Sequence, residues 1–143
     1  MMRSLMVVLV AVSIAATVAA AEDDPRTPIK LPPDMRGAFL EHMRDHMDAL
    51  DDVMAEVANA DFKAAAKVAR EELVAGSGAG FGRYLPLEFR EMGLGMHRAA
   101  AEFADVADAV PAEPTTADWK NAMAALQAIS NQCRACHSTF RVE

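Results

Sequence analysis

Cysteine, aromatic residues and β-branched residues are scarce in this chain of 143 residues. It contains 2 cysteines, 1 tryptophan and 1 tyrosine, and its aromatic fraction is only 6%. Because there is no second cysteine pair, a zinc site with four cysteine ligands is excluded. Alanine dominates where β-branched residues would be needed, so no segment predicts a β-strand. The sequence therefore predicts an all-α protein.

Basic residues are outnumbered, with 14 Lys and Arg against 21 Asp and Glu and a net charge of −7. A surface of this sign argues against nucleic acid or an anionic membrane as a partner. It suits a partner protein with a basic docking patch. No pair of residues resembles a nucleophile and its base, so we do not expect a hydrolytic enzyme.

The first 21 residues have the features of a secretory signal peptide. Arg3 gives a positive start, Leu5 to Val18 is almost wholly apolar, and Ala19-Ala20-Ala21 supplies the small residues of a cleavage site. The apolar run is shorter than the about 20 residues of a membrane span, and an uncleaved N-terminal anchor is the alternative. Cleavage after Ala21 removes 21 residues including Arg3, which leaves 122 residues, 13 basic and 21 acidic side chains and a net charge near −8. We therefore expect an exported, periplasmic protein.

Four segments of the remaining chain have the period of an amphipathic helix. Apolar residues recur in them at three- and four-residue steps. Residues 22–33 are polar and carry four prolines, so we expect an extended leader there. The glycine-rich stretch 76–82 predicts a loop, because its four glycines would each cost a helix about 1 kcal/mol. The predicted helices are 34–58, 61–75, 87–109 and 116–138, with Asp34, Asp61 and either Thr115 or Thr116 as N-caps.

Four helices with short connections predict an antiparallel four-helix bundle over residues 34–143. In an up-down-up-down order, the end of the fourth helix lies beside the starts of the first and third helices and beside the loop before the third. Leu40, Met43 and the segment from Phe81 to Phe89 should then line a common pocket with it. Other methionines of the apolar stripes are expected in the core, namely Met47, Met54, Met92, Met96 and Met123.

The fourth predicted helix ends in Cys133-Arg134-Ala135-Cys136-His137, a pattern typical of covalent haem attachment. Residues three apart share a helix face, so both thiols can add to the two vinyl groups of one haem. The adjacent His137 then supplies an axial imidazole to the iron. Attachment takes place outside the cytoplasm, which agrees with the signal peptide. We therefore predict one covalent haem c near the C-terminal end of the last helix.

A thioredoxin-type redox motif, a zinc site and a disulfide are the alternatives for the two cysteines. The redox motif expects a βαβ pattern and opens a helix, whereas Cys133 and Cys136 close one. A zinc site would need further ligands at suitable spacing, and none is present. The haem interpretation is favoured.

The ending from Cys133 through His137 to Phe140-Arg141 resembles the Cys-X-X-Cys-His-X-X-Tyr/Phe-Arg ending of the cytochrome c′ and cytochrome c-556 family, the class II c-type cytochromes. With the helical layout and the proline-rich break before the last helix, the resemblance covers residues 34–143. In that family the residue on the open side of the iron comes from early in the first helix, four residues after a basic or polar position. If Arg36 marks that position, the resemblance places Leu40 there and implies five-coordinate iron. Met43 or Met35 in that place would instead make the iron six-coordinate.

Further residues are expected around the haem. Arg141, four residues after His137, should lie near the proximal imidazole or a propionate, and a solvated helix-end arginine is its alternative. The expected pocket residues are Phe39, Arg36, Phe89, Phe140 and Arg141.

Three other histidines form a candidate second metal site for copper or zinc. His42 and His46 are i, i+4 neighbours on one helix face, and His97 approaches from the third helix. The favoured interpretation is instead that His42 is solvated and that His46 and His97 are partly buried, hydrogen-bonded residues of the bundle.

These features predict a periplasmic monohaem cytochrome that passes electrons to a redox partner protein, with NO or CO binding at an apolar distal face. A dedicated gas-binding haem protein is the alternative. A haem peroxidase is disfavoured, because that chemistry needs a polar distal acid–base group. The resemblance also implies a homodimer paired through the first two helices, where Ala64, Ala65, Ala66 and Ala69 permit close approach. The alternative is that these alanines line the bundle's own core.

Overall fold

The computed structural model describes residues 24–73 and 80–143. The predicted signal peptide and most of the predicted glycine loop therefore lie outside the described residues. A 3-10 helix, η2 (Phe81–Tyr84), precedes α3, and strands β1 (Thr27–Ile29) and β2 (Phe140–Val142) lie before the first and after the last helix. The described part contains four α-helices, namely α1 (Pro33–Ala58), α2 (Phe62–Glu72), α3 (Leu87–Asp108) and α4 (Thr116–Thr139).

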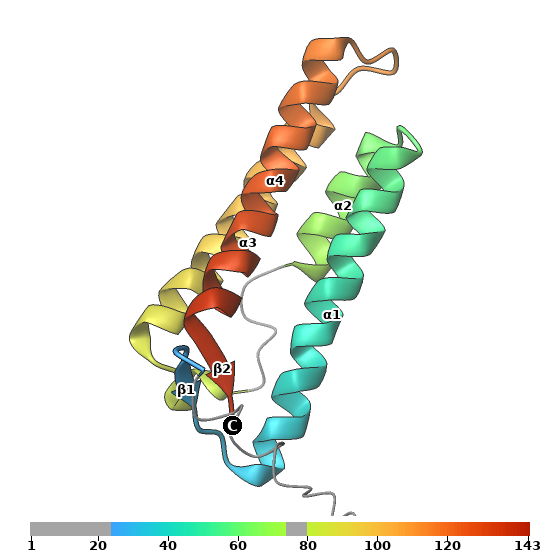
Figure 1. The fold of residues 1–143 in the computed structure, drawn as a ribbon. Helices are drawn as coiled ribbons and strands as arrows, with labels where there is room; N and C mark the ends of the chain where they lie inside the picture. Colours follow the sequence, from blue (N-terminus) through green and yellow to red (C-terminus); the bar gives the residue numbers. More distant parts are fainter. Residues whose placement is uncertain (1–23, 74–79) are drawn as a thin grey trace, which may run out of the picture.

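The helices pack in sequence order, α1 on α2, α2 on α3 and α3 on α4. Consecutive helices run in opposite directions, so that the end of α4 and the start of α1 lie at the same end of the molecule (Figure 1). This arrangement is consistent with a four-helix bundle, and it confirms the prediction of a mostly helical protein. None of the described helices has the length and apolar character needed to cross a bilayer.

Two of the three predicted N-caps are confirmed. The Asp61 side chain accepts a hydrogen bond from the Ala64 amide at 3.0 Å, and Thr115 forms a reciprocal capping box with Asp118. Asp34 is not a cap, because α1 already begins at Pro33. Proline suits the first helical position, where its missing N–H would have had no partner in the helix. Asp34 instead lies in the first turn, where a negative charge favours the helix dipole.

The main core lies between the four helices and is built mostly from alanine, with Val53, Phe103 and Ile129 fully buried within it. The small side chains let helices approach closely, and the few large ones fill the space between them. Ala65 and Ala66 are 0% exposed here and Ala69 is 1% exposed. These three alanines therefore line the bundle's own core, as the alternative interpretation expected, whereas Ala64 is only half-buried.

The methionines do not all enter the core as predicted. Met96 is buried, but Met47, Met54 and Met123 are 51%, 51% and 49% exposed. The apolar stripe on a helix surface is wider than the strip that its neighbours cover. On α1 the covered strip is formed by Ala49, Val53 and Val57, together with Phe39 near the start of the helix.

The two short strands contradict the prediction that the chain has none. β1 pairs with β2 in parallel, with Thr27 opposite Phe140 and Ile29 opposite Val142. The Glu143 amide adds a hydrogen bond of 3.1 Å to the Ile29 carbonyl. Strands of three residues are too short to show an alternating pattern, and this pair joins segments from the two ends of the described chain. The leader is thus extended as predicted, but it is held against the C-terminal segment.

Candidate functional site

A cavity of about 340 Å³ lies at the end of the bundle where α4 finishes. It is bounded by the first half of α1, by η2 and the turn after it, by the first half of α3 and by the last turns of α4. These are the segments that the up-down-up-down order predicted to meet there. The lining residues with chemical or steric importance are Phe39, His42, Met43, His46, Phe81, Phe89, His97, Gln132, Cys133, Cys136 and His137.

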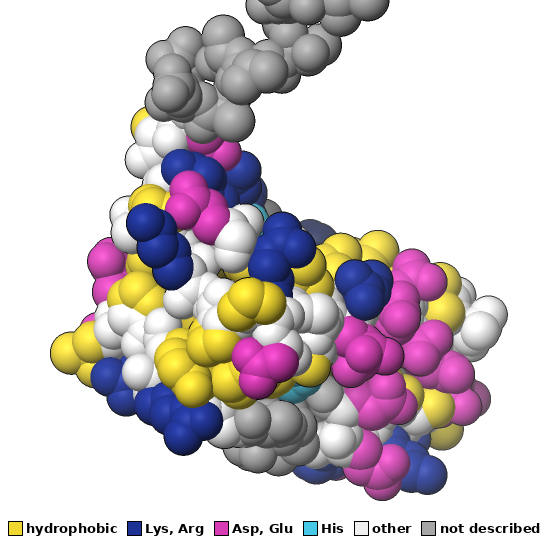
Figure 2. Space-filling model, turned by 90° about the horizontal axis from the view of Figure 1, so that it is seen from below, with side chains coloured by type: hydrophobic (Ala, Val, Ile, Leu, Met, Phe, Trp, Pro, Cys, Tyr) yellow, Lys and Arg dark blue, Asp and Glu magenta, His cyan; other side chains and the backbone are white. Residues whose placement is uncertain are grey.

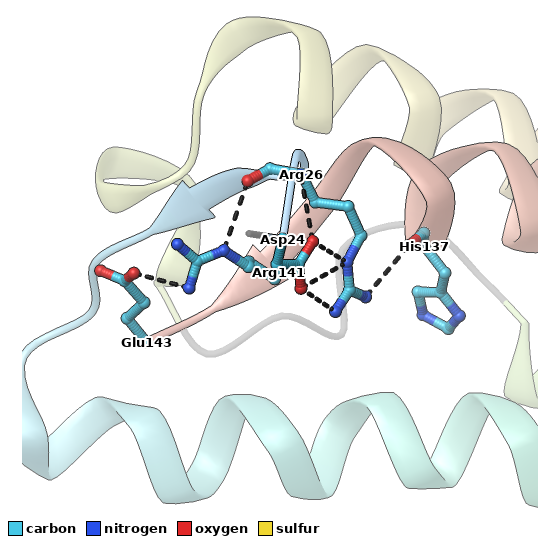
Figure 3. A network of polar contacts seen from close by, with 5 residues as sticks. All are labelled: Asp24, Arg26, His137, Arg141 and Glu143. Carbon is cyan, nitrogen blue, oxygen red and sulfur yellow. Dashed lines mark hydrogen bonds and ion pairs between the residues drawn. The ribbon is translucent and has the colours of Figure 1, made fainter. Parts of the chain in front are cut away.

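The two cysteines and His137 share the α4 wall of the cavity. Both thiols are free and half-buried, and their three-residue spacing places them on one face of α4. His137 is exposed at the helix end, and its imidazole lies on the side of α4 that faces α1 (Figure 3). The predicted attachment residues therefore all border one cavity.

Burial makes these thiols poor nucleophiles in the folded chain. It raises the pKa of the Cys133 thiol, and burial together with the nearby Cys133 raises the pKa of Cys136 to about 11. Catalytic and redox cysteines have the opposite property, since a positive environment lowers their pKa. The environment of Cys133 and Cys136 therefore argues against the thioredoxin-type alternative.

An aromatic group closes the cavity toward the end of the bundle. We call it the end cluster, whose buried members are Ile29, Leu31, Phe39, Phe81 and Phe140. The rings of Phe39 and Phe81 meet edge to face with centroids 5.4 Å apart, and Phe89 lies 5.4 Å from Phe140. Rings in this geometry attract one another and exclude water from the space behind them. Viewed from this end, hydrophobic side chains gather near the centre and acidic ones concentrate toward one side (Figure 2).

The three histidines of the first and third helices also border the cavity. The His46 ring lies 4.4 Å from His42 and 5.5 Å from His97, measured between centroids. His97 Nδ1 is 2.7 Å from the Leu73 carbonyl oxygen, so this nitrogen carries the proton and donates. His46 Nε2 is shielded from solvent and has no hydrogen-bond partner in the part of the chain that the structure describes. Burial, followed by the charges of His42 and His97, lowers the pKa of His46 to about 4.

The favoured interpretation of these histidines holds only in part. His97 is partly buried and hydrogen-bonded as predicted. His46 is also partly buried, but its Nε2 has no hydrogen-bond partner among the described residues. His42 is half-buried, with its ring centroid 6.0 Å from that of Phe81, rather than standing in solvent. The described residues contain no group of three or more His, Cys, Asp or Glu side chains arranged to hold a metal ion. The candidate second metal site on His42, His46 and His97 therefore has no support among the described residues.

The structure separates the three candidates for the distal position. Met43 borders the cavity, whereas Leu40 is half-buried and does not. Met35 packs against the end cluster but is also absent from the cavity wall. Leu40 follows Phe39, which already faces the cavity, and a step of one residue turns a side chain well round the helix. The arrangement favoured by the family resemblance, with Leu40 over the iron, is not supported by this geometry.

The remaining predicted pocket residues fall into two groups. Phe39 and Phe89 line the cavity as expected. Arg36 is exposed on α1, and Phe140 is buried behind Phe89 in the end cluster, so neither reaches the cavity. Arg141 also lies away from it: its side chain pairs with Glu143 at 2.7 Å and donates to the Arg26 carbonyl at 3.3 Å (Figure 3). Arg141 thus contacts the leader, and its expected place near the proximal imidazole or a propionate stays a prediction.

Arg26 is a residue of this region that the sequence did not reveal. Its guanidinium donates to the His137 carbonyl at 3.3 Å and forms an ion pair of 2.6 Å with Asp24 (Figure 3). The ion pair lowers the pKa of Asp24 to about 2, mainly through the hydrogen bonds from Arg26. The leader is thereby hydrogen-bonded to the backbone of His137, the residue that follows Cys136. No local pattern in the sequence points to a contact between residues 111 positions apart.

Gln132 is a second residue that sequence reasoning missed. It lines the cavity from α4, and a Cβ added to Gly95 on α3 would approach its Oε1 to 3.0 Å. The absence of a side chain at Gly95 therefore gives Gln132 its place beside the cavity. A glycine inside a predicted helix is the one signal that could have indicated this close approach.

The residues around the cavity fit a haem c group. Two thiols with the correct spacing and an adjacent imidazole lie on one wall, and aromatic and aliphatic side chains form most of the rest. One buried imidazole nitrogen, His46 Nε2, lacks a partner within residues 24–73 and 80–143. A volume of this order is usual for a site that takes a small molecule. No protein-family model, no curated protein and no solved structure matches this chain, so its function has to be inferred from the motif and the cavity.

Proposed function

We propose that this chain is a periplasmic monohaem c-type cytochrome of the cytochrome c′ and c-556 type, and that it transfers electrons. The observation that carries the proposal is that Cys133, Cys136 and His137 border one largely apolar cavity at the end of a helical bundle. A bound haem supplies a reversible one-electron couple at its iron.

Cys133 and Cys136 would hold the group covalently. Each thiol would add across one vinyl group of the haem, with sulfur bonded to one vinyl carbon, the thiol hydrogen on the other, and no atom lost. His137 would provide the proximal imidazole nitrogen to the iron. The hydrogen bond from Arg26 to the His137 carbonyl and the pairing of β1 with β2 restrain the chain directly after the motif.

The other cavity residues control the surroundings of the group. Phe39, Phe81 and Phe89 keep water out, which lowers the local dielectric constant and reduces the reorganisation that accompanies a change of charge. Met47 and Leu94 border the same cavity and are 51% and 54% exposed, so the cavity reaches the molecular surface there. A site that opens to the surface suits electron exchange with a docked protein. The acidic net charge favours a partner with a basic patch.

Electron transfer is proposed ahead of gas binding because of the wall opposite the motif. A gas-binding site needs a free coordination position on the iron. Met43 and the three histidines border the cavity from α1 and α3, and thioether and imidazole groups are both iron ligands. A test of CO binding by the ferrous protein separates the two functions, because CO needs a free coordination position on the iron.

Covalent attachment tests the proposal directly. The exported protein should retain haem through acid–acetone extraction and denaturing electrophoresis, and its intact mass should equal the processed polypeptide plus one haem. Cys133→Ala/Cys136→Ala should lose the haem in both assays. Arg134→Ala, which changes an exposed position between the cysteines, should keep it. Wild-type protein that releases its haem, or a double variant that retains it, would show that the assignment is wrong.

A further inference from the structure

One buried side-chain nitrogen beside the cavity has no hydrogen-bond partner among the described residues. His46 Nε2 is fully shielded from solvent and accepts and donates no hydrogen bond within the described residues. A buried polar atom in this condition costs about 1–3 kcal/mol relative to one that is satisfied. Such an atom in a site that fits a cofactor is best explained by a bond that the bound group completes.

The other candidate ligands in the cavity have no side-chain nitrogen or oxygen that is buried without a partner among the described residues. The Nδ1 atom of His97 is bonded to the Leu73 carbonyl, and the His42 ring packs against Phe81. Met43 packs against the end cluster, where a thioether needs no polar partner. His46 alone among them presents a buried, unsatisfied donor atom.

The position of His46 also suits a ligand opposite His137. His46 lies on α1 and borders the same cavity as His137 of α4, and the His137 imidazole lies on the side of α4 that faces α1 (Figure 3). The rings of His42 and His97 pack against His46 at 4.4 and 5.5 Å and restrict its rotation. This packing reduces the side-chain freedom that the His46 ring would lose on binding a metal.

We propose that His46 Nε2 is the second axial ligand of the haem iron, which would then be coordinated by two histidines. This inference rests on the proposed function, and it replaces Leu40, Met43 and Met35 at the distal position. His42 and His97 act as positioning residues for the His46 ring. Coordination by His46 and His137 makes the iron six-coordinate and low-spin, closes it to CO, and gives a lower midpoint potential than a histidine–methionine pair.

The test compares the wild type with single variants after haem content has been measured for each by denaturing electrophoresis and mass. Absorption, electron paramagnetic resonance and near-infrared magnetic circular dichroism report the spin state and the ligand pair. Wild-type protein should be low-spin with a bis-histidine signature and should not bind CO. His46→Ala should lose the low-spin signal, bind CO in its ferrous form, and return to low spin when imidazole is added. Met54→Ala, which changes an exposed methionine of α1 outside the cavity, is the control and should keep the wild-type spectra. Met43→Ala tests whether the Met43 thioether is the ligand instead.

Failure of the inference is distinguishable from failure of the proposed function. Covalent haem with high-spin wild-type iron, a histidine–methionine signature lost in Met43→Ala, or low-spin spectra that persist in His46→Ala would each overturn the His46 assignment and leave the cytochrome assignment standing. Absence of covalent haem would overturn both. If His46→Ala does not fold, His46→Met replaces it, and a change to the histidine–methionine signature with a higher midpoint potential is then expected.

Discussion

The chemistry of this protein depends on a few side chains whose properties are set by burial. The thiols of Cys133 and Cys136 and the imidazole of His46 all lie against one cavity, and burial disfavours the charged form of each. The thiols therefore stay protonated and the imidazole stays neutral in the folded chain near pH 7. A neutral imidazole has a free nitrogen lone pair for a metal, which a protonated one lacks.

The raised pKa of Cys136 predicts slow alkylation of the folded, haem-free chain. Because the pKa rises from 9.0 to about 11, the thiolate fraction at pH 8 falls roughly 100-fold, and the rate with iodoacetamide should fall with it. The rate should increase with pH up to about 11, and unfolding in urea should restore an ordinary thiol. Trypsin cleaves after Arg134, so mass spectrometry separates the Cys136 peptide from Cys133. A rate that levels off near pH 7 would instead support a redox motif.

At the level of elements, the leader and the C-terminal segment act as one unit. β1 places Ile29 in the end cluster, where it is 1% exposed, beside Phe140 of β2. Arg26 and Arg141 reinforce the pair through hydrogen bonds to the His137 and Arg26 carbonyls. These arginines are exposed or half-buried, so the buried apolar contact contributes more to stability than the ion pairs do.

Substitutions within β1 test whether burial of Ile29 contributes more to stability than the polar contacts of the leader. Ile29→Ala should lower the free energy of unfolding by about 2–4 kcal/mol, because it leaves a cavity in the end cluster. Thr27→Ala, on an exposed position of the same strand, should change it by no more than about 0.5 kcal/mol. Urea unfolding followed by circular dichroism measures both values. Equal effects of the two substitutions would mean that backbone pairing, rather than burial of Ile29, holds the leader.

At the level of the whole molecule, the burial of alanines in the core determines which side chains remain on the surface to contact a second copy. Ala65, Ala66 and Ala69 face the other helices of their own bundle, which removes them from any intermolecular surface. The homodimer expected from the family resemblance stays a prediction without this support. Met47, Met54 and Met123 are the large apolar side chains that the helices leave exposed.

Overpacking one alanine distinguishes a core role from a dimer role. Ala66→Leu should lower the free energy of unfolding by about 1–3 kcal/mol, because a fully buried alanine has no space for three more carbon atoms. Its sedimentation coefficient should match that of the wild type. Ala124→Leu, on an exposed face of α4, should change stability by at most about 0.5 kcal/mol. If Ala66→Leu abolished self-association and left stability unchanged, α2 would instead form part of a dimer interface.

The sequence by itself determined the helices and the Cys-X-X-Cys-His motif, because both depend on local spacing. Three- and four-residue periodicity predicted all four helices to within a few residues of their observed ends, and the spacing of Cys133, Cys136 and His137 is a property of one helix face. The order of the helices then sufficed to predict which segments surround the cavity.

The tertiary structure alone decided the contacts between distant segments and the choice among similar residues on one helix. The pairing of β1 with β2 and the contact of Arg26 with His137 join residues more than 100 positions apart, and no local pattern encodes them. Leu40, Met43 and His46 all belong to one helix, and only the packing of α1 against its neighbours determines which side chains face the cavity and which nitrogen is buried there without a partner. If α1 were turned about its axis by the angle between two successive residues, different side chains would face the cavity. Hydrophobic periodicity does not predict the orientation of a helix with that precision.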